Sequence, residues 1–231
     1  MAKENKSDAI VIYSKDYKDY DKLLTLYSPV FGKRKAVLRG CKRPNSKQRF
    51  AGLPLFYGEF VLVEAKGYDI IKSVESKNIF INITKDYDKY LDVCQMLKIV
   101  EKNGEYNNYR MQFLLLLTYL TFVDSGKIDY QVCTAKFLME ILRMQGLEPN
   151  TDKCSSCGKQ FDERVFFDQA MNCFVCENCC KNSCIEIKKS VIEVMDTIKN
   201  NKFLELVGKD FDEKSLISVK NILFDIVKVQ L

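Results

Sequence analysis

Two Cys-x-x-Cys pairs restrict the fold of this chain more than any other feature, because each pair can bring two sulfur atoms to one metal ion. The pairs are CSSC at residues 154–157 and CENC at residues 176–179, with eighteen residues between them. Two such pairs at this separation are typical of a tetrahedral zinc site with four thiolate ligands. A site of this kind is coordinatively closed, so it fastens a loop and leaves no position for substrate.

The residues alone leave the second pair open. Seven of the ten cysteines lie within residues 154–184, and Cys173 forms its own Cys-x-x-Cys pair with Cys176. We prefer Cys176 with Cys179. The alternative to a metal site is a group of free thiols that includes a redox pair. Clustered cysteines in a chain without an export signal favour metal over disulfides.

The chain contains no histidine. This excludes the Ser/His/Asp and Cys/His arrangements of nucleophilic catalysis, and it removes the usual ligands of catalytic zinc. Asp16, Asp19 and Asp21 alternate with lysines, which is typical of an exposed loop rather than of a two-metal nuclease. There is no P-loop and no G-x-G-x-x-G motif. The sequence therefore predicts a protein that is not an enzyme.

Positive charge is concentrated near the N-terminus. Residues 1–50 hold 13 basic and 5 acidic side chains, and no acidic residue occurs between Lys22 and Glu59. The other 181 residues carry a net charge of −3. Such a local excess favours an anionic partner, and phosphates are the obvious candidates. The eight candidate DNA-binding residues are Lys33, Arg34, Lys35, Arg39, Lys42, Arg43, Lys47 and Arg49.

A strand over residues 33–39 would place most of its charge on one face. The alternative is an edge strand that charge protects from aggregation, but one or two lysines suffice for that. Aromatic residues follow the basic run, and they either stack on nucleobases or belong to the core. These residues are Phe50, Phe56, Tyr57 and Phe60.

The hydrophobic pattern changes from strands to helices near residue 84. Short β-branched and aromatic segments with turn residues between them predict a small five-stranded sandwich or barrel. The expected strands are residues 9–14, 23–28, 34–39, 59–65 and 69–83. Helical spacing predicts helices at residues 86–103, 109–126, 130–145, about 188–200 and about 212–229. We expect a loop at 101–108, an N-cap at Asp129, a C′ residue at Gly146, and a central position for the apolar residues 113–123.

Three stretches resemble the RecO family of bacterial recombination mediators. Residues 8–47 are similar to the family's opening, with L-T-L, G-K and a basic G-x-K-R-x-x-S run. Residues 136–158 are similar to its helix that ends in L-x-x-x-G-x-x-P before C-x-x-C-G. Residues 167–179 resemble its second cysteine pair, although Asn172 and Cys173 stand where the family usually has two glycines.

The resemblance implies an α+β, multidomain chain. Residues 1–83 would form a five-stranded OB-fold β-barrel, and residues 84–231 an α-helical domain with a four-cysteine zinc-binding loop inserted at about 150–184. It implies one structural Zn²⁺ ion, with Cys173 left as a spare thiol. The implied metal ligands are Cys154, Cys157, Cys176 and Cys179.

The resemblance also implies a function without chemistry. Such a protein binds single- and double-stranded DNA and anneals complementary strands. With RecR, it helps to load the recombinase RecA onto DNA coated by single-strand-binding protein. We expect the helical domain to dock the acidic and apolar tail of that protein. We further expect a cytoplasmic, nucleoid-associated protein without a membrane segment, because the N-terminus has no signal region and residues 113–123 are too short to span a bilayer.

Two readings from other classes remain open at this stage. One is an enzyme that acts on nucleic acid, with thiolate-bound zinc as its scaffold. The other is an OB-fold and zinc-ribbon module of the transcription or translation apparatus that binds RNA. A nicking assay with Mg²⁺ separates the first from a mediator, and competition between DNA and RNA separates the second.

Overall fold

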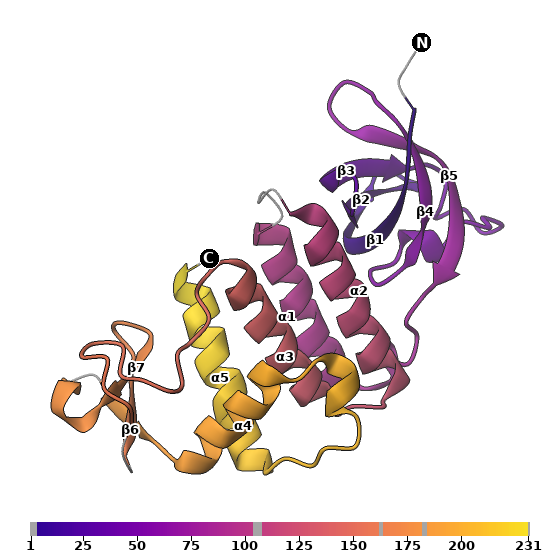
Figure 1. Cartoon of the computed structure of the whole chain (residues 1–231). Coiled ribbons are helices and arrows are strands. Elements are labelled where there is room, and N and C mark those ends of the chain that lie inside the picture. The colour runs from indigo at the N-terminus through magenta and orange to yellow at the C-terminus, as the bar shows by residue number, and fades with distance from the viewer. Residues whose placement is uncertain (1–3, 104–107, 162–163, 182–183, 231) are drawn as a thin grey trace. The chain divides into compact units, whose positions relative to one another are not determined.

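The computed structural model describes residues 4–103, 108–161, 164–181 and 184–230. The contacts divide the chain into two compact units, residues 1–124 and residues 125–231. Five strands come first along the chain, and all the long helices follow these five (Figure 1). None of the helices in the described ranges is long and apolar enough to cross a membrane. The predicted division at residue 83 stays a prediction.

The first unit begins with a closed barrel whose strands follow the order β1-β2-β3-β5-β4 (Figure 1). Most neighbours pair antiparallel, while β3 and β5 pair in parallel at Ala36–Asp69 and Val37–Ile70. A closed five-stranded barrel of this kind is the architecture of an OB-fold, so the predicted fold class is confirmed. The strands are β1 (Glu4–Tyr17), β2 (Asp21–Ser28), β3 (Gly32–Leu38), β4 (Tyr57–Val63) and β5 (Asp69–Asn78).

Alternate residues of each strand fill the barrel, as the two-residue period of a strand requires. In β3, Ala36 and Leu38 are fully buried while Lys35 is exposed. The loop that follows β3 contributes to the same core, because Cys41 and Ala51 are also buried there. The basic segment is therefore anchored at both ends by apolar side chains. The rest of the core includes Ala9, Val11, Leu24, Leu26, Phe56, Phe60, Leu62 and Ile71.

The strand predicted at residues 69–83 is wrong in its last part, because β5 ends at Asn78. The side-chain Oδ1 of Asn78 accepts hydrogen bonds from the backbone N–H groups of Ile79 and Phe80, at 2.8 and 3.2 Å. Asparagine often forms such turns with its own backbone, and they compete with strand pairing. Phe80 then adopts a left-handed conformation, with φ of +44°.

Two helices complete the first unit: α1 (Tyr87–Asn103) and α2 (Tyr109–Ser125). Residues 104–107 of the predicted loop lie outside the described residues. The central position predicted for residues 113–123 is only partly right, because Leu114 is 45% exposed and Met111, one turn earlier, is 48% exposed. An entirely apolar helix gives no periodic signal to show which of its faces is covered.

The barrel and α2 share polar and close contacts within this unit. The hydroxyl of Tyr27, which is fully buried, donates to Oε1 of Gln112. The rings of Tyr57 and Phe113 lie 6.2 Å apart between centroids. Buried polar groups are costly unless they are paired, so these contacts fix α2 against β2 and β4.

The second unit is built on three helices: α3 (Tyr130–Met144), α4 (Lys189–Asn200) and α5 (Glu213–Gln230). Both α4 and α5 pack against α3, and they also contact each other. The predicted caps of α3 are confirmed. Asp129 accepts a hydrogen bond from the backbone N–H of Gln131 at 2.8 Å, and Gly146 takes the left-handed conformation with φ of +72°.

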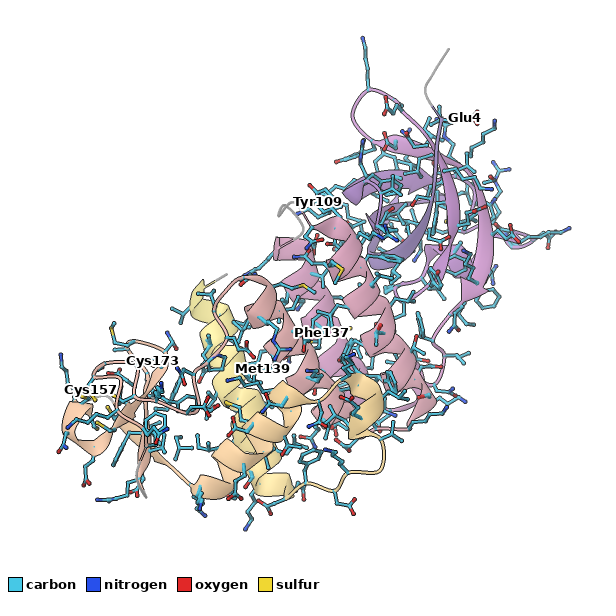
Figure 2. The ribbon with its side chains drawn as sticks, viewed as in Figure 1. Glu4, Tyr109, Phe137, Met139, Cys157 and Cys173 are labelled. Atoms are coloured by element: carbon cyan, nitrogen blue, oxygen red, sulfur yellow. The ribbon has the colours of Figure 1, made fainter. Side chains whose placement is uncertain are left out.

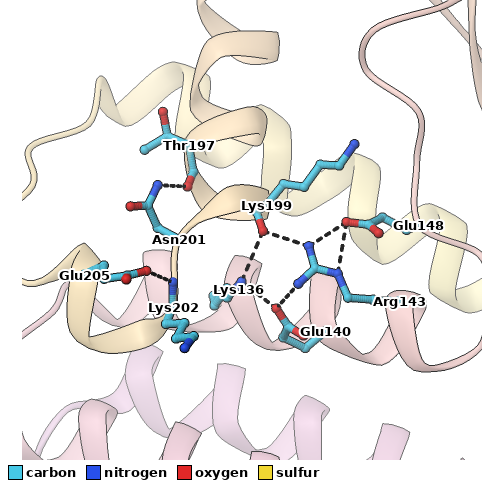
Figure 3. Close-up of polar contacts among 9 residues, drawn as sticks. All are labelled: Lys136, Glu140, Arg143, Glu148, Thr197, Lys199, Asn201, Lys202 and Glu205. Carbon is cyan, nitrogen blue, oxygen red and sulfur yellow. Dashed lines mark hydrogen bonds and ion pairs between the residues drawn. The ribbon is translucent and has the colours of Figure 1, made fainter.

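An ion-pair network around one buried lysine holds the end of α4 against α3 (Figure 3). Lys136 is 2% exposed, and its Nζ lies 2.5 Å from a carboxylate oxygen of Glu140. The backbone carbonyl of Lys199 accepts from Arg143 at 2.8 Å and from Lys136 at 3.4 Å. Arg143 also pairs with Glu148 at 2.7 Å. Because a buried lysine requires such partners, this network fixes how the two helices meet.

Between α3 and α4 the chain forms a small sheet in the order β7-β6-β8. The sequence predicted the loss of helical periodicity here but not the sheet. Its strands, β6 (Val165–Asp168), β7 (Cys173–Cys176) and β8 (Cys184–Ile187), have four residues each. The rings of Phe167 and Phe174, both almost fully buried, pack 5.4 Å apart and give this sheet a core of its own.

Candidate nucleic-acid interface and metal centre

The basic segment begins within β3 and continues into the loop after this strand. Within β3, Arg34 lies on the same face as the inward residues Ala36 and Leu38, whereas Lys33 and Lys35 lie on the outer face. The outer face therefore carries the cations that the strand pattern predicted. Gly40 allows the chain to turn sharply after the strand, with φ of +65°, and its N–H donates to the carboxylate of Asp21 at 2.8 Å.

Three of the eight candidate cations have fixed partners within the protein. Arg34 lies 3.4 Å from the carboxylate of Asp69, and Lys42 lies 2.6 Å from that of Asp16. Lys33 donates to the backbone carbonyl of Glu101 at 2.7 Å. The hydrogen bond from Lys42 also lowers the pKa of Asp16 below its usual value. These three side chains are therefore partly committed to the fold.

The other five cations are exposed, and none of them has a carboxylate partner among the described residues. Arg49 donates to the backbone carbonyl of Pro44 at 3.1 Å, and Arg43 lies over the ring of Tyr20 at 5.5 Å. Both contacts orient a guanidinium without neutralising it. An uncompensated, solvent-facing cation is what a phosphate contact requires. The five are Lys35, Arg39, Arg43, Lys47 and Arg49.

The four aromatic residues after the basic run were expected either to stack on bases or to belong to the core, and they differ in exposure. Phe56 and Phe60 are 3% and 0% exposed and pack edge to face in the barrel core. Tyr57 donates a hydrogen bond to Asp8 at 2.9 Å. Phe50 is 60% exposed. Of the four, only Phe50 is as exposed as a stacking residue must be.

The four cysteines of the two outer pairs lie together, as predicted. The sulfur atoms of Cys154, Cys157, Cys176 and Cys179 all lie within 4.8 Å of one another. Cys157, which is labelled in Figure 2, and Cys176 come from different pairs. Their sulfurs lie 3.8 Å apart. Four thiolates around a tetrahedral ion with metal–sulfur bonds of about 2.3 Å have sulfurs about 3.8 Å apart. The donor set therefore fits a metal ion.

Backbone geometry prepares the first pair for an ion. The backbone N–H of Cys154 donates to the backbone carbonyl of Lys159 at 2.8 Å. The backbone N–H of Ser155 donates to the backbone carbonyl of Phe174 in β7 at 2.9 Å. Burial disfavours the thiolate of Cys154. Hydrogen bonds from backbone N–H groups of the two Cys-x-x-Cys turns outweigh this effect and lower the pKa of Cys154 to about 6. Hydrogen bonds to neighbouring sulfurs raise the pKa of Cys179 to about 12. Four sulfurs this close can all ionise only around a cation.

Both halves of the chain match models of one known family. The family model described as "Recombination protein O N terminal" matches residues 1–80, and "Recombination protein O C terminal" matches residues 84–231. The chain belongs to the RecO family.

Similar curated proteins carry the same family name. The DNA repair protein RecO of Desulforamulus reducens is 29% identical over 199 residues, which cover 84% of this chain and 76% of that protein. That of Thermoanaerobacter sp. is 29% identical over 219 residues, covering 94% and 86%. That of Desulfitobacterium hafniense is 30% identical over 176 residues, covering 75% and 63%.

The resemblance predicted two glycines where this RecO-family chain has Asn172 and Cys173. Asn172 has φ of +50°, a conformation that asparagine tolerates better than most residues, so it can replace a glycine there. Cys173 lies outside the group of four close sulfurs. The structure thus brings together the ligand set that the RecO resemblance implied.

Sequence reasoning missed a second cationic surface at one end of the barrel. A pocket of about 220 Å³ is lined by Tyr17, Lys18, Arg39, Lys66 and Tyr68, among others. The two tyrosine rings lie edge to face at 6.2 Å, and Lys18 lies 5.5 Å from the centre of one ring.

Strand pairing explains why these residues converge. The β2–β3 pairing brings the turn before β2 to the end of β3, and the parallel β3–β5 pairing brings the turn before β5 to the same place. Lys18 and Lys66 occupy those two turns. The sequence shows a basic residue in each turn. The two turns become neighbours only through the parallel pairing of β3 with β5.

Proposed function

We propose that this chain is a non-enzymatic DNA-binding mediator of recombination and repair. It binds single- and double-stranded DNA through the barrel, residues 1–83, and anneals complementary strands. With RecR, it helps to load RecA onto DNA coated by single-strand-binding protein, whose tail docks on residues 84–231. Membership of the RecO family supports this proposal, and so do the relatives described as DNA repair proteins. The proposed location is the cytoplasm, at the nucleoid.

One observation supports the DNA-binding role more than any other. Five exposed cations of a single segment face no carboxylate among the residues that the structure describes. Annealing brings two polyanions together, and their mutual repulsion is the main obstacle. A dense cationic surface releases counterions from both strands and concentrates them, so charge alone can accelerate the reaction.

We propose that the metal is one structural Zn²⁺ ion held by the four close cysteines. Four thiolates close its coordination sphere, so it would stabilise the small sheet and supply no chemistry. Its ligands come from the loop before β6 and from the end of β7 and the turn after it.

Reversal of charge tests the DNA-binding proposal. A triple variant, Lys35→Glu, Arg39→Glu and Lys47→Glu, should bind an oligonucleotide at least about a hundredfold more weakly at low salt and lose annealing. The control is Lys127→Glu, Lys189→Glu and Lys214→Glu in the second unit, which changes the net charge equally. Equal loss in both variants would mean that total charge, rather than this segment, determines binding.

A further inference from the structure

The pocket at the end of the barrel concentrates positive charge. Its lining contains three cations, Lys18, Arg39 and Lys66, and one carboxylate, that of Asp21, so it carries a net charge of +2. The carboxylate is already engaged, because its Oδ1 accepts from the backbone N–H of Gly40 at 2.8 Å. Among the described residues, no ion pair joins any of the three cations to an acid. Cations that share a recess of about 220 Å³ repel one another, so the pocket favours an anionic occupant.

The acids that adjoin these turns in the chain do not cancel this charge. They are Asp16, Asp19, Glu64 and Asp69, and none of the four lines the pocket. Asp16 and Asp69 pair with cations outside it, at 2.6 and 3.4 Å. Glu64 accepts from the side-chain amide of Asn5 at 3.1 Å. The three cations of the lining are therefore left to a ligand.

Strained backbone holds one of these cations at the pocket. Lys18 lies in the tight turn between β1 and β2 and has φ of +56°, a left-handed conformation that lysine rarely adopts. Its Nζ lies 5.5 Å from the centre of the Tyr17 ring, a contact that orients the ammonium group without neutralising it. Strain of this kind is concentrated at sites that clamp a ligand. The turn thus presents Lys18 at a conformational cost.

Two tyrosines give the pocket an aromatic wall. The rings of Tyr17 and Tyr68 meet edge to face at 6.2 Å, and Tyr68 is 39% exposed. Val37 and Ile70, which pair across β3 and β5, complete the lining from the barrel. An exposed aromatic ring beside cations is the arrangement on which a nucleobase stacks. The occupant that suits both the wall and the charge is a nucleotide.

The charge of the pocket distinguishes the end of a strand from its interior. Each phosphodiester inside a strand carries a single negative charge, and successive phosphates are spread along the backbone. A phosphate monoester carries about 1.5 to 2 negative charges at pH 7, because its second pKa is about 6. A lining with a net charge of +2 therefore matches a monoester better than a diester.

We propose that this pocket binds a nucleotide that ends in a phosphate monoester. Lys18, Arg39 and Lys66 contact the phosphate, and the base stacks on Tyr68. Both the phosphorylated end of a DNA strand and a free mononucleotide present these groups. As a strand end, the ligand rests on the proposed DNA binding and deepens it, because Arg39 also begins the part of the basic segment at residues 39–49, along which the strand would continue. As a free mononucleotide, it does not depend on DNA binding.

The test for a strand end uses the full chain and three short oligothymidylates labelled at an internal base. One has a 5′-phosphate, one has a 3′-phosphate and one has neither. In fluorescence anisotropy at about pH 7.5, a phosphorylated strand should bind about fivefold more tightly than the unphosphorylated one. Lys18→Gln combined with Lys66→Gln should reduce this ratio to about one. The control, Lys35→Gln combined with Lys47→Gln, removes the same charge from the same unit, so it should weaken all three and keep the ratio.

The test for a free mononucleotide is equilibrium dialysis of thymidine monophosphate against thymidine, without DNA. The monophosphate should bind more tightly than the nucleoside, and the Lys18 and Lys66 double variant should lose the difference. Such binding without any preference among the oligothymidylates would assign the pocket to free nucleotides. If no oligothymidylate bound at all, the proposed function would be wrong, and the dialysis would still decide whether the pocket takes a nucleotide.

The pH dependence of the ratio tests the charge of the ligand. The preference for the phosphorylated ligand should fall between about pH 7.5 and about pH 5.5, because the monoester loses its second negative charge there. The chain has no histidine whose own charge would change in this range.

Three results would overturn the inference. Neither a phosphorylated strand nor thymidine monophosphate could bind more tightly than its unphosphorylated counterpart. The preference could persist in the Lys18 and Lys66 double variant, or it could be the same at both pH values. Thermal melting of each variant verifies that it is folded. Tyr68→Ala provides a second substitution, which should weaken the binding of the monophosphate without changing the charge of the pocket.

Discussion

The ring of Tyr109 occupies the space that a side chain at position 32 would need. A β-carbon added to Gly32 would lie 2.6 Å from the nearest ring atoms, and the backbone there has φ of +61°. The turn between β2 and β3 can therefore approach the start of α2 only because it contains glycine. This contact joins the basic strand to the helix behind it.

Gly32→Ala should destabilise the protein by about 2–4 kcal/mol, because left-handed backbone strain adds to the overlap with Tyr109. Gly126→Ala is a matched control, since φ is +65° there but nothing lies within 4 Å of the added carbon. It should cost about 1–2 kcal/mol, from backbone strain alone. Urea unfolding of both variants measures the difference. Equal losses would show that Tyr109 moves aside without cost.

Replacing a metal ligand should release the ion. Cys176→Ser should reduce the metal content from one ion per chain to near zero and lower the melting temperature. Cys180→Ser, next to a ligand but outside the group of four sulfurs, should retain the ion. Elemental analysis by mass spectrometry of the purified variants measures both. If Cys173→Ser lost the ion while Cys179→Ser kept it, the alternative pair would be the true one.

Salt dependence should distinguish free from committed cations. Lys47→Gln should reduce the slope of log K against log salt by about 0.7–0.9, since one phosphate contact is lost. Arg34→Gln should change it by less, because Arg34 already pairs with Asp69. Titrating labelled DNA at several salt concentrations gives both slopes. A larger change for Arg34 than for Lys47 would mean that pairing with Asp69 does not keep Arg34 from contacting a phosphate.

The Arg143–Glu148 pair should make stability depend on pH in the acidic range. The hydrogen bond from Arg143 lowers the pKa of Glu148 below its ordinary value of 4.5. The pair therefore stabilises the fold fully above pH 4.5, and this stabilisation is lost as the pH falls through the lowered value. Glu148→Gln should cost about 0.5–1 kcal/mol near neutral pH and less near pH 3.

The control for this pH dependence is Glu193→Gln, an exposed carboxylate on α4. It removes the same charge without removing a described ion pair. Urea unfolding at both pH values should show a smaller difference for Glu193→Gln. If the two variants behaved alike at both pH values, long-range charge rather than the pair would explain the effect.

Local signals in the sequence predicted much of this fold. Alternation in GKRKAVL separated the buried Ala36 and Leu38 from the exposed Lys35, and Asp129 and Gly146 marked the ends of α3. The two cysteine pairs predicted the sulfur cluster, because their spacing is itself the geometric requirement. In each case neighbouring residues carry the whole signal.

Features that depend on distant residues were not predictable in this way. Four-residue strands such as β6 are too short for a period to show, and they form because Phe167 meets Phe174. The sequence left open whether Phe56 and Phe60 stack on bases or belong to the core, and closure of the barrel buries both. Lys18 and Lys66 become neighbours only through the crossover between β3 and β5.

The contacts of α2 with the barrel have a consequence for evolution and for protein engineering. Tyr27, Gly32 and Tyr57 each depend on a residue of α2 for a partner or for the shape of the backbone. The barrel should therefore not fold as an isolated domain if α2 is removed. Substitutions accumulating in α2 would have to be matched by compensating changes in three separate strands or turns.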